Sequence, residues 1–135
     1  MNDKVQYWIE ISDYDIETAS AMLETRRFLY VGFMCHQAIE KILKAFYQLI
    51  RDEIPPKTHN LRFLAKETGL SESLSETQKS FFRMLEPMNI DARYPEYKER
   101  IFDSLTYENC KEILSKTQEM QKWIKQKLLE KQKNI

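Results

Sequence analysis

The polar side chains whose types and spacing best suit a chemical role lie in one short segment, residues 36–44. They are His36, Gln37, Glu40, Lys41 and Lys44. If the segment is an α-helix, with about 100° between successive residues, all five side chains fall within an arc of roughly 140°. Two ammonium groups about one turn apart can bind phosphate oxygens, and a carboxylate beside them can orient an ammonium group or a ribose hydroxyl. The spacing therefore suits a polar face that holds phosphate and ribose groups.

A less specialised interpretation of the same residues stays open. Glu40 and Lys44 stand at positions i and i+4, where an ordinary solvated ion pair stabilises a helix by a few tenths of a kcal/mol. Judged by helical geometry alone, His36 is a packed or half-exposed histidine rather than a catalytic one. Because polar helix faces are common, the spacing does not decide between a solvated face and a binding face.

Further candidates lie outside this segment. His59 stands at the expected start of a short helix, where it either caps and packs locally or faces a cleft. Arg93 and Tyr94 stand in a stretch without helical periodicity, where binding residues concentrate. An arginine beside an aromatic ring suits a phosphate with a neighbouring base. The alternative is a structural turn in which Pro95 fixes the backbone and Tyr94 fills the bundle.

Helices must position these residues, because apolar side chains recur along the chain at three- and four-residue steps. Breakers are rare, with two glycines and four prolines. We expect helices over residues 3–25, 29–51, 58–68, 74–85 and 105–131, an irregular stretch over 88–104, and a charged tail over 130–135 that frays. Thr58 is the expected N-cap of the third helix and Gly69 its end. The fourth helix is expected to begin at a capping box of Ser73 with Glu76 and to end at Pro87.

Length and composition limit the fold class. The chain has 135 residues, of which 42% are hydrophobic and 31% are charged, as in a folded domain with one core. We expect an all-α, four- to five-helix up-down bundle that forms a single domain over residues 1–135. The second helix is apolar on more than one side, so it is either central or shared with a partner subunit.

Charge and cysteine content exclude several function classes. Lysine plus arginine and aspartate plus glutamate each total 21, so no basic field attracts nucleic acid, and RNA is not an expected partner. No signal peptide and no apolar stretch of membrane-spanning length is visible, so we expect a cytoplasmic protein. Cys35 and Cys110 form neither a disulfide framework nor a metal-binding motif, and we expect no metal and no cofactor.

Three ordered motifs resemble those of the HEPN domain family. Residues 33–45, FMCHQAIEKILKA, resemble the family signature around its His-Gln-Ala and Glu-Lys positions. Residues 56–61, PKTHNL, and 92–95, ARYP, resemble two further family motifs in the expected order. A first helix that carries Trp8, Asp15 and Ala19 fits the usual opening. The resemblance covers nearly the whole chain.

The resemblance implies a bundle of four or five helices that forms a homodimer and leaves a polar cleft. Several members pair with a minimal nucleotidyltransferase, and the cleft is proposed to bind a nucleotide. Other members are metal-independent ribonucleases with an Arg, a polar residue and a His after four to six intervening residues. Here Arg93 is followed by Lys-Glu-Arg at 98–100, and Arg51 to His59 spans seven residues that include two prolines. A clean ribonuclease motif is absent, so we assign no catalytic residue.

Three functions remain as hypotheses. The first is a non-catalytic subunit, a homodimer that binds a nucleotide or nucleotide-bearing substrate beside a minimal nucleotidyltransferase. The second is a ribonuclease toxin with a degenerate pair, for which Arg93 and His59 are the first residues to test. The third is a dimerising adaptor without a small-molecule ligand, suggested by the wide apolar surface of the second helix.

Overall fold

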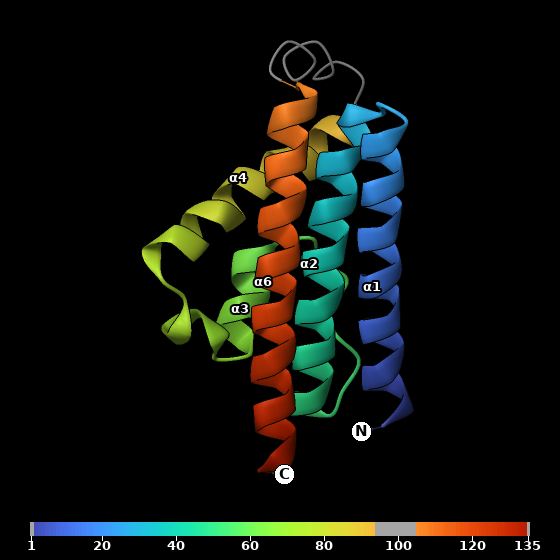
Figure 1. Ribbon diagram of the computed structural model, residues 1–135. Coiled ribbons are helices and arrows are strands. Elements are labelled where there is room, and N and C mark those ends of the chain that lie inside the picture. Colours follow the sequence, from blue (N-terminus) through green and yellow to red (C-terminus); the bar gives the residue numbers. More distant parts are fainter. Residues whose placement is uncertain (1, 94–104, 135) are drawn as a thin grey trace.

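The computed structural model describes residues 2–93 and 105–134, which form helices and no strands (Figure 1). The elements are α1 (Asp3–Glu24), α2 (Phe28–Arg51), α3 (Leu61–Glu67), the short 3-10 helix η1 (Leu70–Ser73), α4 (Glu76–Arg93) and α6 (Tyr107–Lys133). The expected all-α bundle of four to five helices is confirmed. Tyr94 and Pro95 lie outside the described residues, so the prediction for them stays a prediction.

Three long helices, α1, α2 and α6, lie side by side, and α3 and α4 pack to one side of them (Figure 1). The chain runs up α1, back down α2, and down again along α6. This direction follows from the segment between α2 and α6, since α3 and the oblique α4 carry the chain back to the far end of the bundle. No helix in the described part of the chain is both long and apolar enough to cross a membrane.

Helix α2 is the centre of the bundle. It packs against α1, α3, α4 and α6. Its fully buried apolar side chains cover several directions around the helix axis, including Cys35, Ile39, Ile42 and Leu43. Neighbouring helices of the same chain therefore account for the wide apolar surface, which no longer argues by itself for a partner subunit.

The cap of α3 differs from the prediction. Asn60, not Thr58, precedes the helix, and its Oδ1 atom accepts a hydrogen bond of 3.0 Å from the amide of Phe63. Thr58 lies one step earlier, where its hydroxyl oxygen accepts from the amide of Asn60. Thr58 and Asn60 each accept from a backbone amide further along the chain, but only Asn60 accepts from an amide in the first turn of the helix. Gly69 ends this region with a φ of 79°, as expected.

Helix α4 corrects two predictions. The capping box is formed by Ser75 and Gln78, whose side chains and amides exchange hydrogen bonds of 2.9 and 3.1 Å, and not by Ser73 and Glu76. The helix also continues through Pro87 to Arg93. Proline lacks one amide donor but has a helical φ, so it weakens a helix without always ending it. Beyond it, the buried Asn89 accepts a hydrogen bond from Gln37 of α2, which ties this turn to the core.

Helix α6 begins two residues later than expected, because Thr106 serves as its N-cap and accepts from the amide of Asn109. It ends at Lys133, so the charged residues from Glu130 to Lys133, which we expected to fray, are helical. The last fully buried side chain of the helix is Leu128, which anchors this end to the bundle.

Candidate functional site

Six of the residues singled out in the sequence come together around the carboxylate of Glu40. Its Oε1 atom lies 2.8 Å from Nδ1 of His59, and its Oε2 atom accepts a hydrogen bond of 3.1 Å from Nζ of Lys44. We call this group the Glu40 cluster. Its members are Asp15, His36, Gln37, Glu40, Lys41, Lys44 and His59.

The cluster follows from helical spacing on α2 and from the segment that follows it. Residues four apart meet on one helix face, so Glu40 lies beside Lys44 and Gln37 beside Lys41. The helix ends at Asp52, whose φ of 51° turns the chain back. The link over residues 52–60 then returns along the bundle and brings His59 to Glu40, nineteen positions away in the sequence.

Lys41 joins α1 to α2 within the cluster. Its Nζ atom donates a hydrogen bond of 2.8 Å to Oε1 of Gln37. It also lies 3.9 Å from a carboxylate oxygen of Asp15 and 3.9 Å from one of Glu40. Burial raises the pKa of Asp15, and the nearby Lys41 counteracts part of that rise. Lys41 is thus a cation held between two acidic side chains.

The solvated interpretation of Glu40 and Lys44 is wrong. Their side chains are 2% and 9% exposed, so the pair is buried. Burial alone would raise the pKa of Glu40. The hydrogen bond from His59 and the charge and hydrogen bond of Lys44 outweigh that effect, with help from the charge of Lys41, and leave the pKa below its ordinary value. Glu40 is therefore an ionised carboxylate with three basic neighbours.

His36 lies deepest in the cluster and is 1% exposed. Neither ring nitrogen completes a hydrogen bond within the described residues, and the nearest carboxylate oxygen, Oε1 of Glu40, is 3.8 Å from Nδ1. Burial lowers the pKa of His36 to about 4. The charge of Glu40 and the main chain of His59 counteract part of this effect, whereas the charges of His59 and Lys41 add to it. His36 is consequently neutral near pH 7.

His59 and Lys41 form the outward side of the cluster. The side chain of His59 is 51% exposed, and that of Lys41 is 18% exposed. The contact through Nδ1 to Glu40 orients the imidazole, which leaves its other ring nitrogen for a ligand. An imidazole held by a carboxylate can donate a hydrogen bond to an anion or transfer a proton. The arrangement thus suits a phosphate at its outer edge.

The structure does not describe the side chains of Arg93 and Tyr94, which were also predicted to bind the ligand. Arg93 is the last residue of α4, and its side chain lies outside what the structure describes. Tyr94 lies outside the described residues altogether. Their role in binding stays a prediction from the sequence.

The sequence interpretation missed Asp15, which belongs to the cluster, and Trp8 and Asn89, which contact it. Nζ of Lys44 lies over the ring of Trp8, 5.8 Å from its centroid, while Asp15 faces Lys41 and Asn89 binds Gln37. Trp8 and Asp15 are seven residues apart on α1, so they share one helix face. An acidic residue on the buried stripe of an amphipathic helix was the signal that could have identified Asp15. No local signal marks Asn89, because its contact crosses between helices.

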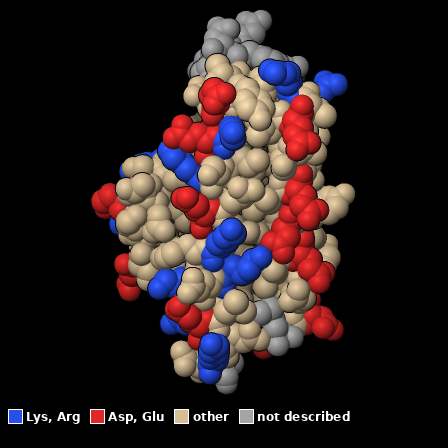
Figure 2. All heavy atoms as spheres, in the orientation of Figure 1, with Lys and Arg blue, Asp and Glu red and all other residues tan. Residues whose placement is uncertain are grey.

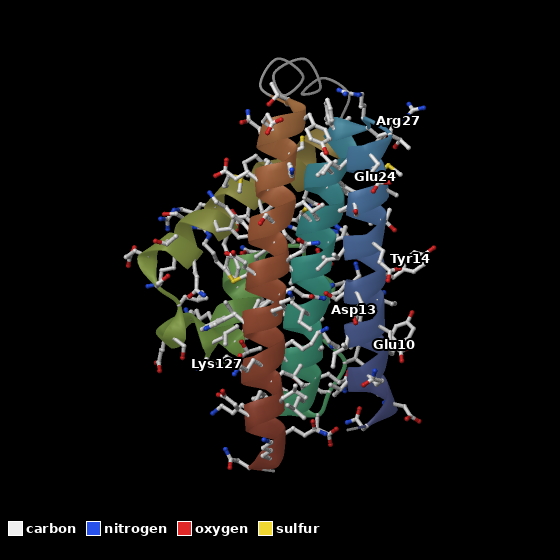
Figure 3. All side chains as sticks on the ribbon, viewed as in Figure 1. Glu10, Asp13, Tyr14, Glu24, Arg27 and Lys127 are labelled. Carbon is white, nitrogen blue, oxygen red and sulfur yellow. The ribbon has the colours of Figure 1, made fainter. Side chains whose placement is uncertain are left out.

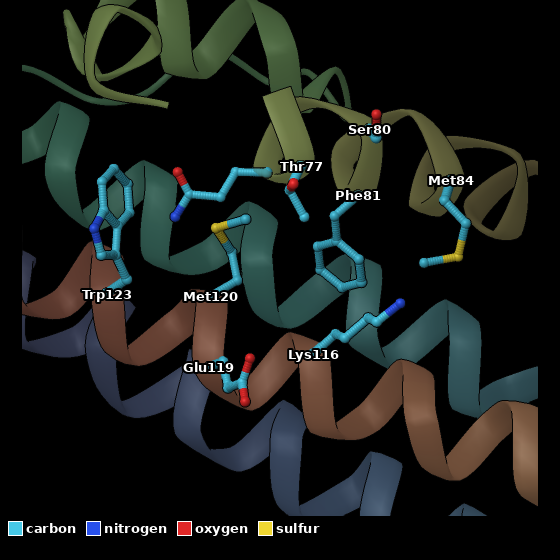
Figure 4. A pocket seen from close by; sticks show the side chains of 9 residues that line it. Thr77, Ser80, Phe81, Met84, Lys116, Glu119, Met120 and Trp123 are labelled. Carbon is cyan, nitrogen blue, oxygen red and sulfur yellow. The ribbon is translucent and has the colours of Figure 1, made fainter. Parts of the chain in front are cut away.

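Two hollows among the described residues are large enough to be compared with the predicted site. One, of about 290 Å³, lies beside the cluster between the start of α1, the end of α2 and the link over 52–60, and Trp8 lines it. The other, of about 560 Å³, lies between α4 and α6 (Figure 4). Phe81, Met84, Met120 and Trp123 give it an apolar wall. None of the residues predicted to bind a ligand lines this larger hollow.

The outer edge of α1 is acidic. Figure 2 shows Asp and Glu side chains gathered along this helix, and Figure 3 shows Glu10 and Tyr14 pointing away from the bundle. Glu10, Glu17 and Glu24 are exposed and recur at every seventh residue, which places them on one face. Within residues 2–93 and 105–134, no three acidic, histidine or cysteine side chains converge to hold a metal ion.

The comparison with protein families agrees with this architecture. The HEPN domain model matches residues 5–128, which includes every element from α1 to most of α6. Neither the curated proteins nor the solved structures gave a match. The matched span holds the whole Glu40 cluster and covers far more than half of the chain. The chain belongs to the HEPN domain family.

Proposed function

We propose that this protein is a non-catalytic subunit that binds a nucleotide, or a substrate bearing one, at the Glu40 cluster. The observation that carries the proposal is the buried pair of Glu40 and Lys44, extended outward by Lys41 and His59. Removing charges from water costs several kcal/mol per ion, which an apolar core would avoid. Clusters of ionisable groups with perturbed pKa values concentrate at functional sites for this reason.

Within the proposed site the cations have different roles. His59 is half exposed and Lys41 is more exposed than Lys44, so we assign the contact with the phosphate to His59 and Lys41. Glu40 is buried and holds the imidazole of His59 and the ammonium group of Lys41 in place, while the buried Lys44 donates a hydrogen bond to Glu40. Gln37 fixes Lys41 from the other side through its hydrogen bond. Arg93 and Tyr94 are proposed as additional contacts on the sequence resemblance alone.

A small ligand fits the electrostatics better than a long nucleic acid. The acidic edge of α1, with Glu10, Glu17 and Glu24, repels a polyanion that would lie along the bundle. The formal net charge of zero provides no long-range attraction. A single nucleotide needs only the local cations of the cluster.

We further propose that the subunit acts as a homodimer together with a minimal nucleotidyltransferase. Membership of the HEPN family supports this assignment. Large apolar side chains at the surface are consistent with association, among them Tyr30 at 45% exposure and Phe63 at 40%.

RNA cleavage is the second candidate function, and one observation favours it. His59 is exposed and its Nδ1 is held by the Glu40 carboxylate, which is the usual arrangement of a general base. Incubation of total RNA with the pure protein tests this function. Cleavage that His59→Gln abolishes would favour the ribonuclease over the binding subunit, and intact RNA would dismiss it.

The proposed function is tested by gentle purification of the tagged protein from its native host, followed by mass spectrometry of the intact assembly. We expect a homodimer with a retained nucleotide or an attached nucleotidyltransferase. Replacement of Lys41 by alanine is expected to remove the nucleotide. A homodimer that carries neither ligand nor enzyme would contradict the proposal and favour the adaptor hypothesis.

A further inference from the structure

A second binding surface lies next to the Glu40 cluster. The smaller hollow, of about 290 Å³, is lined by Asp3, Lys4, Tyr7, Trp8, Gln48, Ile54 and Pro55. We call it the Trp8 hollow. It combines the first two turns of α1 with the last turns of α2 and with the link that leads to His59. The residues that shape it are thus held by the same segments that shape the cluster.

Trp8 connects the two sites directly. Its ring lies beneath Nζ of Lys44 at 5.8 Å, and Lys44 donates to Glu40 at 3.1 Å. A cation over an indole face fixes the plane of the ring. Tyr7 packs edge-on against the same ring, with 5.8 Å between the ring centroids. A ligand in the Trp8 hollow therefore lies one side chain away from Lys44, the innermost lysine of the cluster.

The walls of the hollow suit a flat aromatic ring. Ile54 is 77% exposed and Tyr7 is 57% exposed, so both leave apolar surface in water. Trp8 and Pro55 add rigid faces on which a heterocycle can stack. Asp3, Lys4 and Gln48 also line the hollow, but its surface is almost entirely apolar. Ligand sites commonly combine an apolar wall with a few polar groups, and here the polar groups are those of the neighbouring Glu40 cluster.

We propose that the Trp8 hollow holds the heterocyclic base of the nucleotide whose phosphates contact Lys41 and His59. The proposal rests on the proposed function and adds how the ligand is recognised: by stacking of its base as well as by its charge. An aromatic base next to an anionic phosphate matches an apolar hollow next to a cationic cluster. Inorganic polyphosphate, which lacks a base, engages only the cluster.

The fluorescence of Trp8 can be used to test whether a ligand occupies the hollow. The sequence has two tryptophans, and Trp123 lies in the other hollow, so a Trp123→Phe protein leaves Trp8 as the sole indole. ATP and tripolyphosphate are titrated into this protein, with fluorescence and calorimetry recorded. We expect ATP to quench Trp8 in a saturable manner, and tripolyphosphate to bind more weakly and leave the emission largely unchanged.

Variants at the exposed wall then separate the base from the phosphate. Ile54→Ser and Tyr7→Ser are expected to weaken ATP binding about fivefold or more, because stacking and apolar contact are lost. Both are expected to leave tripolyphosphate binding unchanged. Tyr14→Ser is the matched control, since Tyr14 is an exposed tyrosine on α1 seven residues from Tyr7 and outside the hollow. Because all three side chains are exposed, the variants are expected to fold as the unmodified chain does.

The outcomes distinguish this inference from the proposed function. If neither ATP nor tripolyphosphate binds, the proposed function fails, and the base site fails with it. If ATP binds and Lys41→Ala weakens it, while Trp8 emission and the wall variants show no effect, the site stands and the base is elsewhere. If Trp8 emission instead depends on protein concentration without ligand, and Ile54→Ser abolishes that dependence, a second copy fills the hollow and the inference is overturned.

Discussion

Oε1 of Glu40 lies 2.8 Å from Nδ1 of His59, so a carboxylate in the centre of the bundle holds a histidine that is half exposed. The other oxygen of the same carboxylate accepts a hydrogen bond from Lys44. The link over residues 52–60 is therefore tied to α2 by a charged contact and not by apolar packing alone. Changes at Glu40 are expected to reach both the stability of the bundle and its outer surface.

Glu40→Gln is expected to lower the free energy of unfolding by roughly 3 kcal/mol, because it leaves the buried ammonium group of Lys44 without its counter-ion. Chemical denaturation at pH 7 measures the change. Glu112→Gln is the matched control: Glu112 and Lys116 are also i and i+4, and their charged atoms are 3.0 Å apart, but their side chains are 64% and 54% exposed. Its effect is expected to stay below about 1 kcal/mol. Equal losses in the two variants would contradict the account of a buried pair.

The free energy of unfolding is expected to fall as the pH drops from 6.5 toward 4, because His36 is buried in its neutral form. Its pKa is about 4 in the folded protein, against an ordinary value of 6.5, so the unfolded chain binds more protons in this range. Well above pH 6.5 the imidazole of His36 is neutral in both states and does not affect the free energy of unfolding. By pH 4 that free energy has fallen by roughly 3 kcal/mol. Glu40, whose pKa is lowered from 4.5, adds its own loss only at the acidic end.

Denaturant titrations at several pH values test this dependence. His36→Leu is expected to flatten the curve between pH 6.5 and 4, since the buried ionisable group is gone. His59→Gln, a change at the only other histidine, is expected to keep most of the slope. If the slope instead persisted in His36→Leu and disappeared in His59→Gln, His59 and not His36 would be the cause of the pH dependence.

Gly32 of α2 lies directly against Met88 of α4. A Cβ atom at this position would lie 2.5 Å from Sδ and 3.2 Å from Cβ of Met88. Gly32→Ala is therefore expected to destabilise the protein, because crowding of about 1–3 kcal/mol outweighs the gain in helix propensity of about 1 kcal/mol. In a Met88→Ala background the same change is expected to be stabilising. A double-mutant cycle measures both, and an identical effect in the two backgrounds would exclude the contact as the cause.

Pro87→Ala is expected to stabilise the protein. Pro87 is exposed within α4 and has no amide hydrogen to donate to the preceding turn. Alanine restores that donor and is favoured over proline inside a helix by about 3 kcal/mol. The greater freedom of the unfolded chain offsets about 1 kcal/mol of this gain. Thermal unfolding followed by circular dichroism measures the shift. An unchanged or lower melting temperature would argue that the helix does not continue through residue 87.

Most of the fold was predictable because apolar periodicity is strong on α1, α2 and α6. Their long stripes are set by contacts that recur every three to four residues and are visible in the sequence. The errors concern local signals that tertiary contacts override. Pro87 was expected to end a helix, yet the hydrogen bond between Gln37 and Asn89 holds the next turn in place. Ser75 and Gln78 form the cap because η1 already occupies Ser73.

The shared face of the residues from His36 to Lys44 could be predicted from the sequence, but the environment of that face could not. Spacing identified the residues from His36 to Lys44 as one face, but it could not show that α1 covers that face and buries Glu40 and Lys44. An exposed ion pair contributes little to stability, whereas removal of one partner of a buried pair is strongly destabilising. The approach of His59 depends on the return of the link over 52–60, which no local pattern encodes.

Calorimetric titration of ATP into the purified protein measures nucleotide binding at the Glu40 cluster. We expect saturable binding that Lys41→Ala weakens by about tenfold or more, because one charge-assisted contact is lost. Lys79→Ala, at an exposed lysine on α4 outside the cluster, is expected to bind as the unmodified chain does. Absence of heat at millimolar ATP, or equal affinities in the two lysine variants, would contradict a nucleotide site at the Glu40 cluster.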